Sequence, residues 1–426
     1  MAGQTCVTRR TFLSASASAV AFPYAIPSSA LGGSGGVPAS ERLVMGAIGV
    51  GGQGMRHVGG GIWVQGGGFL SKPGVQVVAV ADVNRNNLEN ARNVVNRHYG
   101  NEDCAAYGDF RELLARDDID IILCATGDRW HTPISIAAAR AGKDIYCEKP
   151  ISLTVHEARA LAREVKRYAR IFQTGTQQRS WYEFRFACEL VRNGYIGEVE
   201  RIKVNVGGPP EECNLPAGGP PPEWLDYDMW LGQAPWRPFH PGLLGWMRWK
   251  DYSGGEMTNW GAHMFDIAQW AMGMDESGPV EIAPPDGGDV RALTYRYANG
   301  TIMTREPISR PTPGVRFEGT EGMVEVSREH LITEPESLRR QRIGPNGVHL
   351  YESREHPDNF LECVRTRKRP ASDADVGCRS ITVCHLGNIA YWLNRPLRWD
   401  PVGEQFAEDP EADRMLWREM RSPWQI

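Results

Sequence analysis

The segment AIGVGGQGMRH, residues 47–57, decides the fold of this 426-residue chain. It places Gly49, Gly51 and Gly54 in a GxGxxG pattern, directly after an apolar run and before residues with helical spacing. The first glycine permits a tight turn, the second lets the backbone approach a pyrophosphate, and the third allows a helix to pack closely on a strand. The amide groups at the start of that helix then face the phosphates. The pattern therefore predicts a dinucleotide-binding turn.

Short apolar runs alternate with segments of helical spacing from Leu43 to about residue 176. The runs predict five strands, in LVMGAIGV (43–50), VQVVAVADV (75–83), DIDIILCATG (118–127), AGKDIYCEK (141–149) and IFQTGT (171–176). Strands that alternate with helices indicate an α/β fold with a parallel, doubly wound sheet of the Rossmann type. We expect this dinucleotide-binding domain to span residues 43–175.

The pattern changes after residue 176. Asn299-Gly300 separates two alternating runs, which predicts a β-hairpin, and a second hairpin is expected to turn at residues 320–322. We therefore expect an α+β domain with a mainly antiparallel sheet over residues 176–426, for substrate binding and oligomerisation. A Pro-, Gly- and Trp-rich loop between Gly207 and Gly245 is long enough to suggest a functional role.

The first thirty residues are typical of an export signal. TRRTFL, residues 8–13, looks like a twin-arginine signal, and Ser28 and Ala30 precede a plausible cleavage point. Residues 31–42 are expected to be a linker. The apolar part of the signal is too short and too rich in serine for a membrane span, so we expect a periplasmic protein without a stable span once the signal is removed.

Composition excludes some classes of protein. The net charge of −5 and the lack of a basic run argue against nucleic-acid binding. The nine cysteines are scattered without CxxC spacing, which favours free thiols and predicts no zinc or other metal site.

Two predicted strands end in charged side chains that could bind a ligand or take part in catalysis. Asp82 follows the second predicted strand, where a carboxylate binds the adenosine ribose; this favours NAD, while Arg85 leaves NADP possible. The fourth strand ends in Glu148-Lys149-Pro150, and the proline biases Lys149 to an extended backbone at the ligand-binding edge of the sheet. Taken alone, this pair is equally compatible with an ordinary surface Glu–Lys pair.

A histidine lies in the segment SGGEMTNWGAHMFDIAQWAMG, residues 253–273. His263 is near the start of a predicted helix, Asp266 shares its helical face, and Asn259 precedes it by four residues. A histidine is a natural general base for a hydroxyl proton near neutral pH. The alternative is a helix-start histidine bonded to local backbone.

These motifs together resemble the Gfo/Idh/MocA family of oxidoreductases. The resemblance rests on the glycine pattern, on WHTP followed by AGKDIYCEKPISLT, and on GGEMTNWGAHMFD, and it spans residues 43–426. The closing segments CHLGNIAYWLNRPLRWDP and EADRMLWREMRSPW resemble the exported, twin-arginine members. The resemblance implies that Lys149 and His263 flank the nicotinamide and the reacting carbinol, with Asn259 beside them.

The resemblance and the motifs give a set of expected site residues. Cofactor binding is expected of Gly49, Gly51, Gly52, Gln53, Gly54, Asp82, Thr126, Trp130, His131, Glu148 and Lys149. Substrate binding is expected of Arg179, Arg248, Trp249, Trp260 and Asp266. Eight of the fourteen tryptophans lie between Trp181 and Trp270, and their flat faces suit the C–H face of a sugar ring, although core packing is the alternative for each.

Three positions depart from the family pattern. Asn259 stands where sugar and inositol dehydrogenases commonly have aspartate, Gly127 where a proline is expected, and Cys378 where relatives often have histidine. An amide at residue 259 can orient a hydroxyl but cannot share a proton, which places more of the proton transfer on His263.

The sequence therefore predicts an NAD(P)-dependent enzyme that transfers hydride between a tightly bound nicotinamide cofactor and a secondary alcohol of a sugar or polyol. A carried cofactor suits the periplasm, which has no free NAD pool, and favours a ping-pong scheme. Alternatives are a glycoside-cleaving enzyme that oxidises the sugar transiently and, less favoured, a non-catalytic sugar or nucleotide sensor. An open sheet in the second domain predicts a homodimer or homotetramer.

Overall fold

The computed structural model describes residues 37–61, 64 and 66–426. The expected export signal, residues 1–30, and the first part of the expected linker lie outside the described residues. A short 3-10 turn, η2 (Ala39–Glu41), precedes Leu43. Residues Leu43–Ile426 form one compact unit, and the features described below belong to it.

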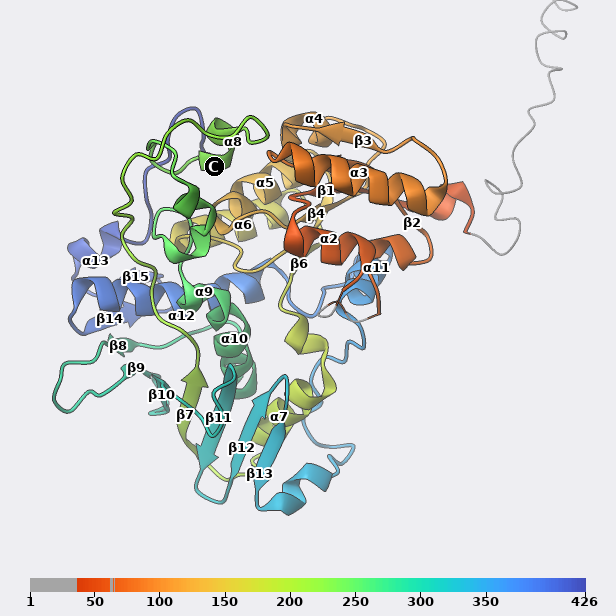
Figure 1. Cartoon of the computed structure of the whole chain (residues 1–426). Helices are drawn as coiled ribbons and strands as arrows, with labels where there is room; N and C mark the ends of the chain where they lie inside the picture. The colour runs from red at the N-terminus through yellow and green to blue at the C-terminus, as the bar shows by residue number, and fades with distance from the viewer. Residues whose placement is uncertain (1–36, 62–63, 65) are drawn as a thin grey trace, which may run out of the picture. The chain divides into compact units, whose positions relative to one another are not determined.

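A parallel six-stranded sheet forms the first part of this unit (Figure 1). Its strands are β1 (Leu43–Ile48), β2 (Val75–Ala81), β3 (Ala105–Tyr107), β4 (Ile121–Cys124), β5 (Asp144–Cys147) and β6 (Phe172–Thr174). They lie in the order β3-β2-β1-β4-β5-β6, and each neighbouring pair is parallel. The order reverses beside β1, as in doubly wound sheets, so the predicted Rossmann-type sheet is confirmed.

The helices of this part begin just beyond the carboxyl ends of the strands. They are α2 (Gly52–Gly59), α3 (Arg85–Tyr99), α4 (Phe110–Leu114), α5 (Asp128–Arg140) and α6 (Val155–Arg167). Side-chain caps fix several of these starts: Asn84 accepts from the amide of Asn86, and Thr154 from that of Glu157. The strand-to-helix turns therefore gather at one edge of the sheet.

The edge strand β3 was not predicted. It has three residues, all only partly buried, and it pairs with β2 at the edge of the sheet. Such a strand needs no apolar run, because its pairing rests on backbone hydrogen bonds at the border of the sheet.

A nine-stranded, mainly antiparallel sheet forms the second part, as predicted. Its strands are β7 (Val199–Asn205), β8 (Glu281–Ala283), β9 (Leu293–Arg296), β10 (Ile302–Arg305), β11 (Gly314–Gly319), β12 (Met323–Ser327), β13 (Leu331–Glu334), β14 (Leu397–Asp400) and β15 (Gln405–Phe406). The order is β13-β12-β11-β7-β10-β9-β8-β14-β15. Both predicted hairpins are present, β9–β10 and β11–β12, and β7 with β10 is a parallel pair.

The remaining helices pack partly on this sheet and partly on the first part. The α-helices are α7 (Tyr182–Arg192), α8 (Tyr227–Leu231), α9 (Glu256–Asn259), α10 (Gly261–Met272), α11 (His356–Thr366), α12 (Ala374–Leu393) and α13 (Pro410–Arg414). The 3-10 helices are η3 (Phe69–Ser71), η4 (Gln177–Ser180), η5 (Pro241–Leu244), η6 (Trp246–Arg248) and η7 (Glu336–Arg340).

The two parts share an apolar core. Helix α12 packs against α6 of the first part and α10 of the second, and one cluster of buried residues runs through both. Helix α11 adds Phe360 to a second cluster, beside β2 and Tyr146. Burial of this apolar surface fixes α10 relative to the carboxyl edge of the parallel sheet.

Two further features concern the residues that the structure describes. None of their helices is both long and apolar enough to cross a membrane. Their eight cysteines are unpaired, and burial raises the pKa of the Cys378 thiol to about 12. Cys378 lies in the interior of α12, where it packs as a small apolar side chain.

Candidate active site

The turn between β1 and α2 has the geometry that its glycines predict. Gly49 has φ +80°, and a Cβ on Gly49 would lie 2.6 Å from the backbone nitrogen of Thr126. A Cβ on Gly54 would lie 1.9 Å from the carbonyl oxygen of Gly49. Larger residues are therefore excluded at both positions, and Gly51, the N-cap of α2, leaves the helix start accessible to a ligand.

Asp82 lies at the carboxyl end of β2, beside this turn. Its Oδ2 accepts from the amide of Val50 at 2.9 Å, and its Oδ1 accepts from the amide of Asn84 at 2.8 Å. Burial raises the pKa of this carboxyl group, against the effect of its hydrogen bonds, which include one from Asn87. These bonds fix the carboxylate at the edge where a ribose would bind.

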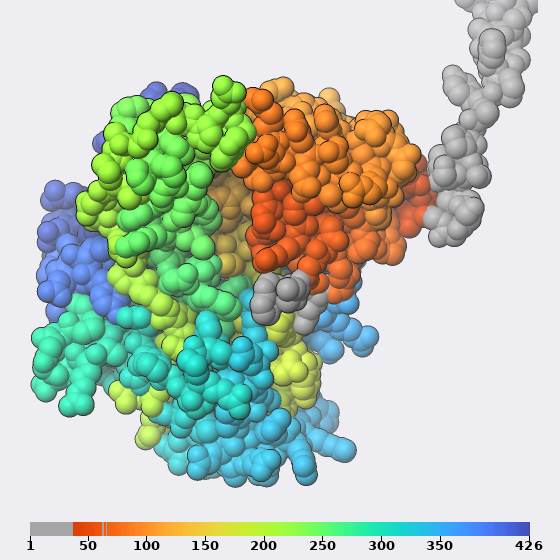
Figure 2. Space-filling view, in the orientation of Figure 1, coloured from red at the N-terminus to blue at the C-terminus, as the bar shows by residue number. Residues whose placement is uncertain are grey.

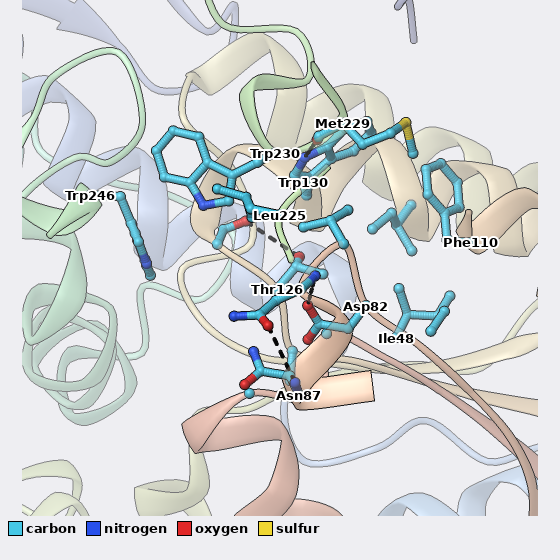
Figure 3. Close-up of a pocket in the computed structure, with 18 of the residues that line it drawn as sticks. Ile48, Asp82, Asn87, Phe110, Thr126, Trp130, Leu225, Met229, Trp230 and Trp246 are labelled. Carbon is cyan, nitrogen blue, oxygen red and sulfur yellow. Dashed lines mark hydrogen bonds between the residues drawn. The ribbon is translucent and has the colours of Figure 1, made fainter. Parts of the chain in front are cut away.

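A cavity of about 470 Å³ lies above the turn, and Figure 3 shows its wall. One side consists of the glycine turn, Gln53, Asp82 and Thr126. The other side comes from the loop over residues 207–249, which we call the tryptophan segment. It contributes Trp224, Leu225, Met229, Trp230, Leu244 and Trp246.

Backbone hydrogen bonds hold the tryptophan segment to the first part. The amide of Arg85 donates to the carbonyl of Trp224 at 2.8 Å, and the amide of Asp226 donates to that of Val83 at 2.9 Å. Leu225 and Asn84 form an antiparallel bridge. In Figure 2 the lime and orange atoms of these two regions meet at the surface. The tryptophan segment is thus a cover over the cavity.

Trp130 and His131, from the first turn of α5, have different surroundings. Trp130 lines the cavity and donates through Nε1 to the carbonyl of Met229 at 3.0 Å. The ring of His131 lies between the carbonyls of Pro150, at 2.7 Å, and Thr126, at 3.1 Å. His131 is not a wall residue of the cavity; it braces the ends of β4 and β5, and burial lowers its pKa.

Lys149 lies just beyond the end of β5 and reaches α9 of the second part. Its Nζ donates to Asn259 Oδ1 at 2.7 Å. The amide nitrogen of Asn259 in turn donates to the carboxylate of Glu256 at 3.2 Å, which fixes the orientation of the amide. The sequence placed these two residues in different domains, and the structure brings them into contact.

His263 lies one turn further, in α10, and is 3% exposed. Its Nε2 lies 3.2 Å from the guanidinium of Arg328, so Nε2 is the acceptor and Nδ1 carries the proton. Burial and the nearby charges of Arg328 and Lys149 lower the pKa of His263 well below its usual value. The ring is therefore neutral and suited to accept a proton.

Glu148, the residue before Lys149, forms a buried pair with His57. Glu148 Oε1 lies 2.5 Å from His57 Nε2 and accepts from Gln177 Nε2 at 3.1 Å. Burial alone would raise the pKa of Glu148, but the hydrogen bond with His57 and nearby positive charge, including that of Lys149, outweigh it and lower the pKa to about 2. Gln53, a wall residue of the cavity, lies 3.4 Å from the same carboxylate and joins this pair to the cavity.

The structure places four of the expected substrate residues away from this group of side chains. Arg179 and Asp266 form a buried ion pair at 2.8 Å, so Asp266 contacts Arg179 rather than His263. Arg248 is exposed and paired with Glu211. Trp249 is buried and donates through Nε1 to a carbonyl within the tryptophan segment.

The fifth expected substrate residue, Trp260, packs beside His263. Their ring centroids are 5.8 Å apart, and the guanidinium of Arg328 lies 4.8 Å from the Trp260 ring. The sequence did not predict Arg328, which follows β12 in a hairpin turn. A lone arginine in a turn carries no signal, because its contact with His263 joins residues 65 positions apart.

Family comparisons agree with this geometry. Residues 44–176 match the NAD-binding Rossmann fold of the Gfo/Idh/MocA oxidoreductases, and residues 213–426 match the C-terminal alpha/beta domain of the same family. The chain belongs to the Gfo/Idh/MocA oxidoreductase family. The resemblance predicted from the motifs is confirmed at this level, and the first part is an NAD-binding Rossmann domain.

Several proteins are similar to this chain over part of its length. A myo-inositol 2-dehydrogenase of Thermotoga maritima is 28% identical over 274 residues, 61% of this chain and 72% of the relative. A glycosyl hydrolase family 109 protein of Shewanella sp. (strain MR-4) is 31% identical over 200 residues, 45% of this chain. That match spans only 40% of the length of the glycosyl hydrolase.

Solved structures share the fold. The aldose-aldose oxidoreductase from Caulobacter crescentus, complexed with glycerol, has a TM-score of 0.58 and 19% identity, covering 84% of this chain and 99% of its own. The WlbA dehydrogenase from Bordetella pertussis, in complex with NADH and UDP-GlcNAcA, has a TM-score of 0.55 and 17% identity, covering 83% and 96%. At these identities the likeness concerns the fold.

The wall of the cavity fits NAD. The turn leaves no room for a Cβ at Gly54, Asp82 holds a carboxylate at the ribose edge, and apolar side chains face them from the tryptophan segment. Among the described residues, no cluster of three or more His, Cys, Asp or Glu side chains could hold a metal ion.

Proposed function

We propose that this protein transfers hydride between NAD and a secondary alcohol of a sugar or polyol. The observation that carries the proposal is the contact between Lys149 and Asn259, 2.7 Å long, which brings an ammonium group beside the helix of a buried, neutral histidine. An ammonium donor and a neutral imidazole are the two groups that oxidation of a carbinol needs.

His263, Lys149 and Asn259 have different roles in the proposed reaction. His263 Nε2 accepts the hydroxyl proton, which requires the substrate hydroxyl to replace Arg328 as its partner. Lys149 donates to the same oxygen and stabilises the negative charge that develops there. Asn259 holds the Lys149 ammonium in place. NAD, when bound, supplies the hydride acceptor.

We further propose that NAD is the preferred cofactor and is tightly held. Asp82 would repel a 2′-phosphate, and the tryptophan segment covers the cavity opposite the glycine turn. A retained cofactor suits a ping-pong reaction, in which a second carbonyl compound reoxidises it. The twin-arginine motif supports export in the folded state to the periplasm, and we propose a homodimer or homotetramer there.

A second candidate is glycoside cleavage through transient oxidation of the sugar ring. The 31% identity to the glycosyl hydrolase family 109 protein favours it. Oxidation of a ring carbon would acidify the neighbouring C–H, and that proton and the leaving group would be eliminated. Water would then add to the double bond, and the hydride would return to the carbonyl carbon. The same lysine and histidine serve both reactions, so the products separate the two.

One experiment decides between them. Purified protein is incubated with a panel of sugars, polyols and glycosides, while the absorbance of reduced nicotinamide and the product masses are followed. We expect reduction of nicotinamide without bond cleavage, and cleavage without net redox change would establish the second candidate. His263→Ala should abolish turnover and retain the cofactor. A His263→Ala variant that turns over at the wild-type rate would refute the proposed base.

A further inference from the structure

Arg129 is a buried arginine in the wall of the cofactor cavity. It lies in the first turn of α5, directly after the β4–α5 turn, and is only 2% exposed. No motif in the sequence predicts a role for it. Burying a guanidinium is costly unless its charge and its N–H groups are compensated, so its contacts are informative.

One side of the guanidinium is hydrogen-bonded to the tryptophan segment. Nε donates to the carbonyl of Trp230 at 2.8 Å, and Nη2 donates to the same oxygen. The guanidinium carbon lies 4.2 Å from the ring centre of Trp230 and 5.1 Å from that of Tyr252. Gln233 donates to the backbone carbonyl of Arg129. Arg129 therefore fastens the cover to α5.

The other side of the guanidinium has no partner. Nη1 is buried and makes no hydrogen bond within the part of the chain that the structure describes. A Cβ placed on Gly127 would lie 2.9 Å from Nη1, so this nitrogen lies beside the β4–α5 turn, itself a wall of the cavity. A buried N–H donor without a partner, at the wall of a ligand cavity, points to a ligand acceptor.

The charge of Arg129 is also incompletely balanced. The neighbouring carboxyl group, Asp128, is buried and accepts from Ser253 at 2.7 Å. Burial raises the pKa of Asp128 to about 7, so it is only partly ionised at neutral pH. Burial likewise lowers the pKa of Arg129 to about 10. An anionic ligand would supply the missing compensation.

We propose that Arg129 donates through Nη1 to the diphosphate of the bound dinucleotide and thereby ties the cofactor to the tryptophan segment. This proposal rests on the NAD binding proposed above. Gly49, Gly51 and Gly52 border the same cavity, and their turn is the part of the fold that binds diphosphate. The guanidinium of Arg129 then contacts both the cofactor and the carbonyl of Trp230. The bound cofactor and the tryptophan segment therefore stabilise each other's position.

Binding of cofactor fragments to the cofactor-free chain tests this proposal. Affinities for adenosine, ADP, NAD and NADP are measured by titration calorimetry for wild type, Arg129→Gln and Arg129→Lys. We expect Arg129→Gln to lose about tenfold or more in affinity for ADP and NAD, as for loss of a charge-assisted bond, and little for adenosine. Arg129→Lys should be intermediate. Arg140→Gln, which alters an exposed ion pair with Glu164 at the far end of α5, is the matched control.

The outcomes separate the possibilities. An equal loss for adenosine and ADP would mean that Arg129 acts only through the cover, and a loss confined to NADP would mean that it contacts a 2′-phosphate; either overturns the proposal. Wild-type protein that binds neither ADP nor NAD would overturn the proposed function as well. If the variants do not fold, a crystal structure of wild type with ADP decides: Nη1 should lie within about 3.2 Å of a phosphate oxygen, and a clearly longer distance refutes the contact.

Discussion

Lys149 Nζ lies 2.7 Å from Asn259 Oδ1, which joins the carboxyl end of β5 to the helix that precedes His263. The amide of Asn259 is oriented from its other end by Glu256. Lys149 is therefore held by a neutral acceptor, and its positive charge is not neutralised there. An ammonium in this state can stabilise a developing alkoxide more strongly than one already paired with a carboxylate.

Two substitutions at Asn259 should distinguish two effects: the loss of the hydrogen-bond acceptor for Lys149, and the replacement of a neutral acceptor by a charged one. Asn259→Leu removes the acceptor from Lys149, and we expect kcat to fall about 100-fold with NAD affinity unchanged. Asn259→Asp keeps an acceptor at the same place, so it should retain at least about a tenth of wild-type kcat. Steady-state kinetics with the substrate found in the panel checks both.

Lys149→Met removes the ammonium group itself, so it gives the largest decrease in kcat that the Asn259 variants can approach. Lys250→Met is the control. Lys250 is paired with Glu212 at the surface, and its loss should leave the rate unchanged. An Asn259→Leu enzyme as active as wild type would show that Lys149 needs no such support.

Buried histidines should make the fold sensitive to acid. His385, in α12, lies 3.3 Å from Ser152 Oγ, and burial lowers its pKa to about 4. Between pH 6.5 and 4 the unfolded chain binds a proton at this residue and the folded chain does not. The free energy of unfolding therefore falls as the pH falls through that window, by up to about 3 kcal/mol for this residue.

His385→Gln tests this directly by urea unfolding at pH 8 and pH 4.5. At pH 8 the variant should be the less stable protein, because it loses packing and the contact with Ser152. At pH 4.5 the difference should shrink or reverse. His98→Gln, at an exposed position, should show the same difference at both pH values. A His385→Gln deficit that does not change with pH would contradict the assigned protonation.

Local patterns predicted the parts of the site that depend on neighbours in sequence. The glycine turn, Asp82 at the end of β2 and Lys149 at the end of β5 all follow from where a parallel strand stops. Their positions are set by the strand and by the residues directly after it. The two hairpins of the second sheet were predicted for the same reason, since the turn residues lie between the paired strands.

Long-range contacts account for what the sequence did not predict. Asp266 shares a helical face with His263, yet its carboxylate pairs with Arg179, 87 residues away. The sequence did not tell which of the tryptophans line a cavity and which pack in the core, and the structure places Trp224, Trp230 and Trp246 in the wall of the cavity. Composition identifies the loop as aromatic, but its hydrogen bonds with Val83 and Arg85 determine that it lies over the cavity.

Cofactor preference should depend on Asp82. Asp82→Ser removes the carboxylate that would repel a 2′-phosphate, and Arg85, three residues further along the chain, remains. We expect the ratio of NAD to NADP affinity to fall by about tenfold or more. Titration of the cofactor-free variant with both dinucleotides measures the ratio. Asp118→Ser, which removes a surface carboxylate paired with Arg116, serves as the control.

The cover should control how fast the cofactor leaves. Trp246 is a partly exposed wall residue of the cavity, and Trp236, in the same segment, is 65% exposed and lines no part of it. Trp246→Ala removes apolar contact with the ligand, so we expect NADH to dissociate about tenfold faster or more, with kcat for bound cofactor within a few-fold of wild type. Trp236→Ala should leave the dissociation rate unchanged. Stopped-flow displacement of NADH by excess NAD gives both rates.

Equal dissociation rates in the two variants and wild type would mean that the tryptophan segment does not retain the cofactor. The ping-pong scheme would then lose its structural support.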